Sequence, residues 1–141
     1  MILTNEKLKE RILVVDDELE IAQMVQSRLV ADGYEVSLAH SGEDGLKKIE
    51  QEKFDLIVLD VMMPGLSGYE VCAKIKRNKK QMLPVIMLTS RNKMIDERLG
   101  FLCKADAYVR KPMSGQLLLP EIKKLIKVFK IKKMERKVQD G

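Results

Sequence analysis

Ile12-Leu13-Val14-Val15-Asp16-Asp17 is a run of four aliphatic residues that ends in two carboxylates. An uninterrupted apolar run of this kind is typical of a strand that is buried on both faces, as strands are in parallel sheets. Two later runs follow the same plan, because Leu56–Leu59 ends at Asp60 and Val85–Leu88 ends at Thr89. The chain therefore repeats one unit, an apolar strand followed by oxygen-bearing side chains.

A fourth, shorter run, Ala107–Arg110, ends at Lys111. In open parallel α/β sheets, ligands bind just beyond the carboxyl ends of the strands. We therefore expect the carboxylates, the hydroxyl and the ammonium group that follow the four runs to meet at one edge of the sheet. This combination of groups indicates a divalent metal ion and a phosphoryl group.

Segments with helical spacing of apolar residues separate the runs, which predicts βαβ units, a parallel sheet and helices on both of its faces. We expect helices at 18–32, 43–52, 68–78, 93–104 and 114–136, and strands at 11–15, 34–39, 55–59, 84–88 and 106–109. Ser41 and Ser67 are placed to cap two of the helices. The strand at 34–39 alternates and has one more polar face, which favours an edge position.

The length of 141 residues indicates one domain with a real core. The first residues lack a signal-peptide pattern, and no apolar run approaches the length of a membrane span, so we expect a cytoplasmic protein with no membrane partner. The net charge of +5 belongs to residues 120–141, which hold eight Lys or Arg and three Asp or Glu, while the rest of the chain balances. The basic pI is therefore weak evidence for nucleic acid, and we expect no direct nucleic-acid binding by this domain.

We expect one domain over residues 1–130, with its core at about 11–130, followed by a basic extension or the start of a linker at 131–141. Cys72 and Cys103 are isolated, with no close cysteine or histidine partner in the sequence. Small buried side chains in a reducing compartment explain both cysteines.

The residues themselves define a minimal chemistry. Asp16, Asp17 and Asp60 repel one another unless a hard cation such as Mg²⁺ offsets their charge. Lys111 can pair with a phosphate oxygen, and the Thr89 hydroxyl can donate to another. Attack by a carboxylate on a phosphoryl donor follows, and Asp60 is the expected nucleophile because no acid stands beside it.

Each of these residues has an ordinary explanation when it is taken alone. An Asp-Asp pair after a strand is usually part of a solvated loop, Thr89 is a typical strand-end residue, and Lys111 is a typical surface lysine. The prediction of a site rests on their joint arrangement, each at the end of a buried run.

The chain resembles the receiver domain of bacterial two-component response regulators over about residues 11–130. Four segments carry the resemblance in order, namely 12–18, 59–68, 88–90 and 106–112. The resemblance implies a flavodoxin-like three-layer sandwich around a doubly wound five-stranded parallel sheet in the order 2-1-3-4-5. This strand order comes from the resemblance and not from the spacing of the runs.

The resemblance also implies roles at the metal site. Asp60 would be the phosphoacceptor and a metal ligand. Asp17 would bind Mg²⁺ directly, Asp16 mostly through water, and the backbone carbonyl of Met62 would be a further ligand.

Other residues would respond to the phosphoryl group. By resemblance, Lys111 would pair with a phosphate oxygen, and Thr89 would move to hydrogen-bond the phosphoryl group with help from the Ser90 backbone N–H. Tyr108 would be the switch aromatic that rotates inward when Thr89 moves. The peptide bond between Lys111 and Pro112 is usually cis in this family.

The function implied is a phosphorylation-dependent signalling switch that is not an enzyme and that assists only its own phosphorylation and dephosphorylation. A sensor histidine kinase, a phosphotransfer protein or a small phosphodonor would supply the phosphoryl group. The fourth helix, fifth strand and fifth helix would form the face for an output partner or a homodimer. No DNA-binding domain is present in this sequence, and whether an output domain follows it in a longer regulator stays open.

Two positions depart from the usual family pattern. Lys104 stands where the family often has glycine, which changes the end of the fourth helix if that turn needs positive φ. Pro120 falls inside the expected last helix, where it would kink or delay the helix. Both positions lie near the expected output face, so the partner and the dimer mode stay open.

Two alternatives remain beside the signalling switch. The first is a pseudo-receiver that uses the same fold only to bind proteins. The second is a haloacid-dehalogenase-like phosphatase with an Asp nucleophile. That family places a second acid two residues after the nucleophile, and Met62 occupies this position here.

Overall fold

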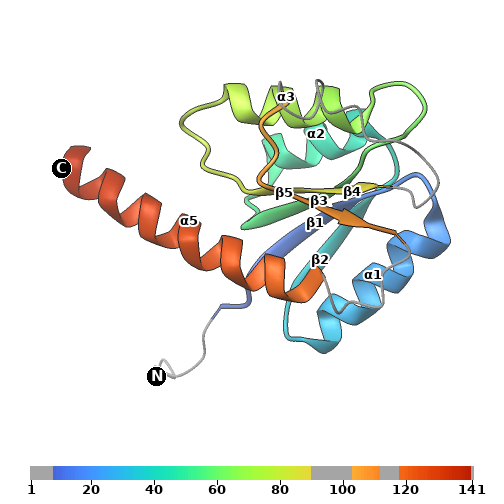
Figure 1. Cartoon of the computed structure of the whole chain (residues 1–141), viewed down its shortest axis with the longest axis horizontal. Helices are drawn as coiled ribbons and strands as arrows, with labels where there is room; N and C mark the ends of the chain where they lie inside the picture. The colour runs from blue at the N-terminus through green and yellow to red at the C-terminus, as the bar shows by residue number, and fades with distance from the viewer. Residues whose placement is uncertain (1–7, 90–102, 112–117, 141) are drawn as a thin grey trace.

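The computed structural model describes residues 8–89, 103–111 and 118–140 and contains one parallel sheet between layers of helices (Figure 1). The strands are β1 (Arg11–Val15), β2 (Glu35–Ala39), β3 (Leu56–Asp60), β4 (Val85–Thr89) and β5 (Ala107–Arg110). The helices are α1 (Leu19–Ala31), α2 (Gly42–Gln51), α3 (Gly68–Arg77) and α5 (Leu118–Asp140). The helix expected at 93–104 falls almost wholly outside the described residues.

The strand order is β2-β1-β3-β4-β5, and neighbouring strands are parallel. The expected order 2-1-3-4-5 and the edge position of β2 are therefore confirmed. The register pairs Val15 with Leu59 and Asp60 with Leu88, so the carboxyl ends of β1, β3 and β4 lie side by side. All five residues of β3 are buried, as the apolar run predicts for a central strand.

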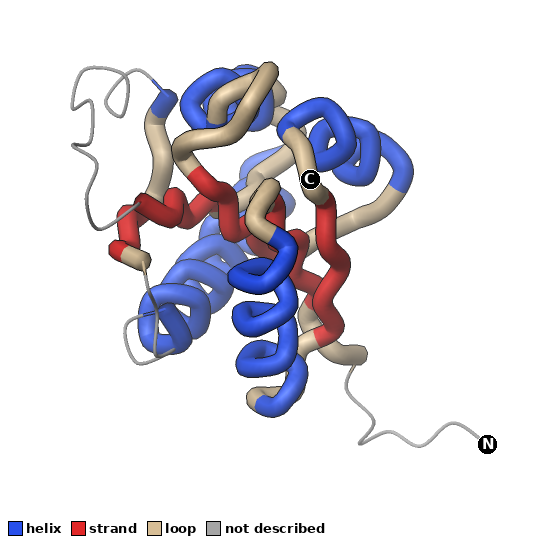
Figure 2. The backbone as a smooth tube through the Cα atoms, turned by 90° about the vertical axis from the view of Figure 1, so that its right-hand side faces the viewer, coloured by secondary structure: helices blue, strands red, loops and turns tan. Residues whose placement is uncertain are grey.

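Helices cover both faces of the sheet, α1 and α5 on one side and α2 and α3 on the other (Figures 1 and 2). Successive strand side chains point to opposite faces. Leu13 and Val15 accordingly join the core under α2 and α3, while Ile12 and Val14 join the core under α1 and α5. Residues of β1, β3 and β4 thus contribute to the core on both faces of the sheet.

The predicted caps are present at two helices. Ser41 Oγ accepts a hydrogen bond from the Asp44 backbone N–H at 3.1 Å, and Ser67 Oγ accepts one from Glu70 at 3.3 Å. Each cap satisfies a backbone donor that the first turn of a helix leaves unpaired. A serine before the first helical residue was therefore enough to predict both caps.

The last helix crosses position 130 without a break and runs to Asp140. Pro120 lies in the first described turn of α5, where a missing N–H costs little because first-turn donors have no intrahelical acceptor. No helix in the described part of the chain combines the length and the apolar character that a membrane span requires.

Candidate functional site

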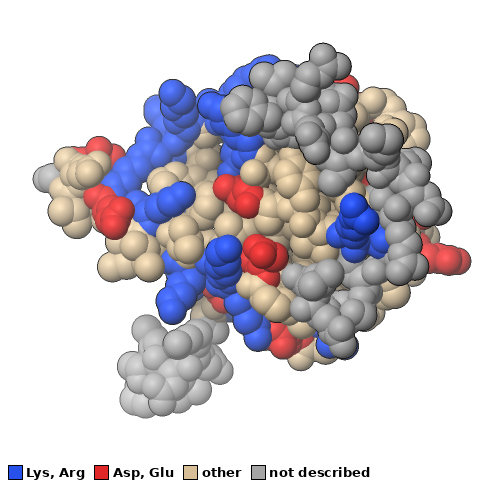
Figure 3. All heavy atoms as spheres, in the orientation of Figure 1, with Lys and Arg blue, Asp and Glu red and all other residues tan. Residues whose placement is uncertain are grey.

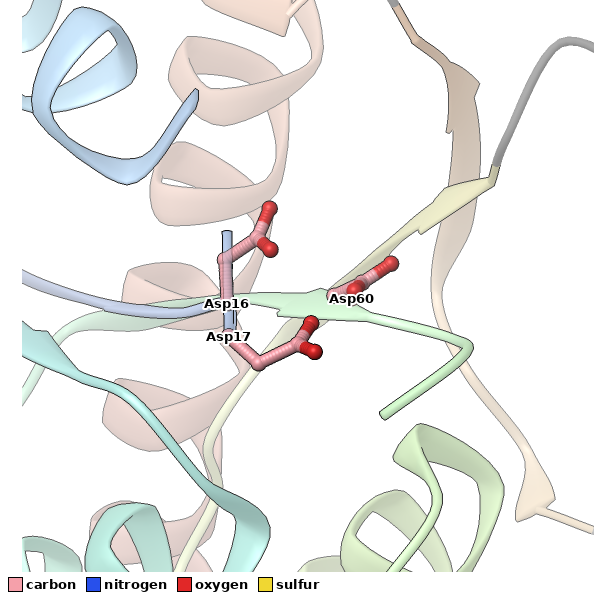
Figure 4. A group of neighbouring side chains, drawn as sticks. All are labelled: Asp16, Asp17 and Asp60. Atoms are coloured by element: carbon pink, nitrogen blue, oxygen red, sulfur yellow. The ribbon is translucent and has the colours of Figure 1, made fainter. Parts of the chain in front are cut away.

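Three aspartates converge at the carboxyl edge of the sheet (Figure 4). Asp16 and Asp17 directly follow β1, and Asp60 is the last residue of neighbouring β3. One carboxylate oxygen from each lies within 4.8 Å of the others. Asp16 and Asp60 are buried and Asp17 is exposed, so the group opens to solvent on one side. The structure thus brings together the three acids that the sequence placed at strand ends.

Lys111 lies among these carboxylates, one residue beyond β5. Its Nζ is 2.7 Å from Asp16 Oδ2, 3.3 Å from Asp60 Oδ1 and 3.5 Å from Glu18 Oε1. Its side chain is only 7% exposed, so these contacts are poorly screened by water. Glu18 was not predicted as a member of the site, although it directly follows Asp16 and Asp17 in the sequence and could have been included for that reason.

Asp16 is held by the backbone around it. Its N–H donates to the Ala39 carbonyl at 3.0 Å, and its Oδ1 accepts from the Glu18 backbone N–H at 2.9 Å. With Lys111 on its other oxygen, Asp16 is committed to protein contacts on both sides. The division of cation ligands among Asp16, Asp17 and Asp60 that the resemblance implies stays a prediction.

Burial and charge set the protonation of the site. Burial, together with the neighbouring charge of Asp16, raises the pKa of Asp60 to about 7 even though Lys111 and the Met62 backbone oppose the rise. Burial lowers the pKa of Lys111, but its hydrogen bond to Asp16 and the charges of Asp60 and Asp16 outweigh burial, so the pKa rises overall. Lys111 therefore stays a cation, whereas burial and the charge of Asp16 disfavour the ionised form of Asp60.

Thr89 ends β4 beside the acids. It is 3% exposed, and its Oγ1 has no hydrogen-bond partner within the described residues. Its carbonyl accepts from the Lys111 backbone N–H at 2.7 Å, which ties the two strand ends together. A buried hydroxyl without a partner is costly unless a ligand supplies one.

Gly68 allows the chain after β3 to return against Asp60. A Cβ added at Gly68 would lie 2.1 Å from the Asp60 carbonyl oxygen and 2.8 Å from Val61 Cα. The Gly68 N–H donates to the Val61 carbonyl at 2.9 Å, so the start of α3 is bonded to the loop that follows the acid. Gly68 was predicted as the first residue of a helix that follows a turn-rich segment, but its close approach to the Asp60 backbone brings together atoms that no sequence pattern relates.

The remaining predicted residues are placed only in part. Tyr108 is 37% exposed, and its hydroxyl lies 3.8 Å from Cys103 Sγ. Met62 is half exposed, and its backbone contributes a hydrogen bond to Asp60. Ser90 and Pro112 lie outside the described residues, so the predicted roles of the Ser90 N–H and of the peptide bond at Pro112 stay predictions.

The donor set suits a hard divalent cation. Carboxylate oxygens are the preferred ligands of Mg²⁺, which usually takes one or two of them and keeps several waters. Three carboxylates within 4.8 Å of one another, with one exposed, satisfy that requirement. A cation here would also offset the repulsion that raises the pKa of Asp60. The residues present therefore fit a magnesium ion.

Comparisons with known proteins agree with this picture. Residues 12–123 match the family model of the response regulator receiver domain. The chain is 44% identical over 120 residues to the alkaline phosphatase synthesis transcriptional regulatory protein PhoP of Bacillus subtilis, covering 85% of this chain and 50% of that protein. It is 42% identical to the transcriptional regulatory protein AfsQ1 of Streptomyces coelicolor, covering 82% of this chain and 51% of that protein. The chain thus spans about half the length of these relatives.

Solved structures show the same architecture. The receiver domain protein of Methanospirillum hungatei, described as CheY-like, superposes with a TM-score of 0.81 at 31% identity, covering 89% of this chain and 99% of that one. The response regulator TrrA of Thermotoga maritima, solved in complex with Mg²⁺-BeF, gives a TM-score of 0.75 at 39% identity, covering 82% and 98%.

Proposed function

This chain belongs to the family of response regulator receiver domains of two-component signalling, and from that premise we propose that Asp60 accepts a phosphoryl group and thereby switches an output surface. The observation that carries the proposal is the grouping of Asp16, Asp17, Asp60 and Lys111 at one sheet edge. This grouping retains every charge that the transfer requires, which a protein used only for binding would not need.

In this proposal an oxygen of the Asp60 carboxylate attacks the phosphorus of the donor, and the donor's leaving group departs with its bonding electrons. The Lys111 ammonium, already 3.3 Å from Asp60 Oδ1, pairs with an oxygen of the transferred group. Thr89 supplies its hydroxyl as a donor to a second phosphoryl oxygen, which would give this buried group a partner. The backbone N–H of Ser90 assists Thr89.

Asp17 and Asp60, with the Met62 backbone carbonyl, would hold Mg²⁺ directly, and Asp16 would contact the ion through water. Bound there, the ion supplies positive charge that offsets the negative charge of the phosphoryl oxygens. The exposure of Asp17 beside the buried Asp60 supports this assignment, because it leaves room for water and substrate on one side.

We propose that a sensor histidine kinase or a phosphotransfer protein donates the phosphoryl group, and that small phosphodonors can replace it. Movement of Thr89 would draw Tyr108 inward and change the face formed by the 93–104 segment, β5 and α5, where an output partner or a second copy binds. Tyr108 is partly exposed in this structure, which supports its capacity to move. The proposal includes an output domain in a longer regulator and a cytoplasmic location, which the free cysteines fit.

The test is the intact mass of the chain after incubation with Mg²⁺ and acetyl phosphate. We expect the wild type to gain one phosphoryl group and Asp60→Ala to gain none while keeping its circular dichroism spectrum. Glu50→Gln, which removes an exposed carboxylate of α2 away from the site, is the matched control and should be labelled like the wild type. Labelling of Asp60→Ala as an acyl phosphate would contradict the assignment.

A folded wild type that gains no mass from acetyl phosphate would next be tested with a panel of histidine kinases. Transfer from any of them would retain the proposal, and failure with all of them would favour the pseudo-receiver. The family match and the absence of an acid at Met62 disfavour the phosphatase alternative. Repeated turnover of a phosphomonoester by the wild type would revive it.

A further inference from the structure

Helix α5 carries two apolar stripes on opposite sides. The first stripe, made by Ile122, Leu125 and Phe129, is buried against the sheet. The second stripe consists of Ile131, Met134 and Val138, each of which stands nine residues after one member of the first. Because an α-helix has about 3.6 residues per turn, nine residues make two and a half turns. The second stripe therefore points away from the domain.

The second stripe is open to solvent. Ile131 is 50% exposed, Met134 68% and Val138 81%. These residues lie in the half of α5 that projects past the sheet (Figure 1). The opposite side of this half is already engaged, because Arg136 donates a hydrogen bond to the Lys79 carbonyl after α3. The domain therefore has no means of covering the second stripe by rotating the helix without losing that contact.

The spacing of the second stripe is that of a coiled-coil seam. Ile131, Met134 and Val138 follow one another at intervals of three and four residues, as the a, d and a positions of a heptad do. We propose that this stripe is a contact for a second copy of the same chain, with the two α5 helices parallel and in register. Each apolar residue would then face its own counterpart across a two-fold axis.

The charges beside the stripe select the parallel arrangement. With Ile131 at a, Lys130 occupies g and Glu135 occupies e, and in a parallel pair a g residue lies next to the e residue five positions later on the partner. Lys130 would therefore meet Glu135 of the other copy, sharing its present ion pair with Glu10. An antiparallel pair would instead bring Lys130 near Lys137, which is repulsive.

The same register limits the contact to the end of the helix. One heptad earlier, the a and d positions are Lys124 and Lys127, whose charges would repel their counterparts. Basic side chains, Lys and Arg together, also gather on the surface around this half of α5 (Figure 3). The contact is therefore short and weak, and it uses only residues 131–138 of α5.

Site-specific cross-linking tests the proposal on the full chain. We expect Met134→Cys to form a disulfide-linked dimer under mild oxidation at least about five-fold more readily than Lys132→Cys, because d residues face each other and b residues do not. The wild type gives the background, since Cys72 and Cys103 are buried. Equal cross-linking of the two variants would overturn the proposal.

The direction of pairing has a separate readout. An equimolar mixture of Ile131→Cys and Val138→Cys should give mainly the two homodimers if the helices are parallel, and an excess of the mixed dimer would overturn that arrangement. Sedimentation velocity should show self-association of the wild type that rises with concentration and is lost in the double variant Ile131→Glu and Val138→Glu. The exposure of both residues means that these substitutions leave the core intact. The proposal does not rest on phosphorylation of Asp60.

Discussion

Asp60 lies in surroundings that disfavour its charged form. It is 3% exposed and lies beside Asp16, and its pKa is raised to about 7, first by burial and then by the charge of Asp16. A carboxyl whose pKa is higher in the folded than in the unfolded chain binds more protons when folded. The ionised form therefore destabilises the fold at neutral pH, and stability falls as the pH rises from about 4 to about 7.

Replacing Asp60 with Asn should remove this cost. Without Mg²⁺ at pH 8, we expect Asp60→Asn to raise the free energy of unfolding by up to about 4 kcal/mol, because the pKa of Asp60 is raised from 3.8 to about 7 and one pKa unit corresponds to about 1.4 kcal/mol. The loss of charge at position 60 also leaves Lys111 paired with Asp16. Near pH 4 the two proteins should be similar. Urea unfolding in the presence of a chelator at several pH values measures both quantities.

Glu50→Gln is the control for this comparison, because an exposed carboxylate carries no burial cost and its removal should change stability by no more than about 0.5 kcal/mol. An Asp60→Asn protein that is less stable than the wild type at pH 8 would show that the lysine contacts outweigh the cost of burial.

Lys104 illustrates strain at a single residue away from the site. Its φ is 59°, which makes it the one non-glycine residue with positive φ in the described part of the chain. The turn before β5 therefore does need the conformation that glycine adopts freely, as the family pattern suggested. A lysine there costs about 1 kcal/mol relative to an unstrained residue. This departure affects the turn and leaves β5 in place.

At the scale of elements, the connection from β3 to α3 positions Asp60. Ser67 caps α3, and Gly68 allows the first turn of this helix to lie against the Asp60 carbonyl. Residues 61–67 connect β3 to α3, and the contact of Gly68 with Asp60 and Val61 brings the two ends of this loop together next to the Ser67 cap. Position 68 cannot hold a side chain unless Asp60 moves.

Gly68→Ala tests this connection. Alanine favours helices over glycine by nearly 1 kcal/mol, so propensity alone predicts a gain. We expect a loss of about 3 kcal/mol instead, because the new methyl group would overlap backbone atoms that cannot move independently of β3. Thermal unfolding gives the stability, and the phosphoryl assay should show reduced labelling because Asp60 is displaced.

Ser67→Ala is the matched variant for this element. It should lose about 1 kcal/mol through the missing cap while Asp60 stays in position and is labelled normally. If Gly68→Ala were no less stable than Ser67→Ala, the close approach to Asp60 would not constrain the loop.

At the scale of the whole molecule, binding of a cation to the acids should couple to unfolding. A ligand that binds only the folded state adds about 1.4 kcal/mol of stability when its concentration is ten times its dissociation constant. We expect Mg²⁺ to raise the melting temperature of the wild type, because the three carboxylates meet only when β1 and β3 are paired. Calorimetry with increasing Mg²⁺ measures this coupling.

Asp17→Asn should lose most of that increase, since it removes the exposed ligand without disturbing the buried pair of Asp16 and Lys111. Glu50→Gln should retain the increase. A rise of equal size in Asp17→Asn would place the bound cation away from these acids.

The local sequence determined the elements and their succession along the chain, while the order of the strands within the sheet was predicted from the resemblance. Apolar runs without a polar face specify buried strands, and serine or glycine at the helix ends specifies where helices begin and stop, because these preferences act over a few residues. They also placed Asp16, Asp17, Asp60, Thr89 and Lys111 at strand ends, which was enough to predict a site. The helix expected at 93–104 falls almost wholly outside the described residues, and the expected end of the domain at position 130 stays a prediction.

Tertiary structure decided what depends on contacts between distant segments. The pairing of Lys111 with Asp16 rather than with Asp17, the raised pKa of Asp60 and the crowding at Gly68 all arise where β1, β3 and β5 end together. Helix α5 likewise has features set by its sequence and features set by tertiary packing. Its sequence defines two apolar stripes with equal spacing, and only packing against the sheet determines that Ile122 is buried and Ile131 is exposed, because burial is a property of the neighbours that a chain folds against.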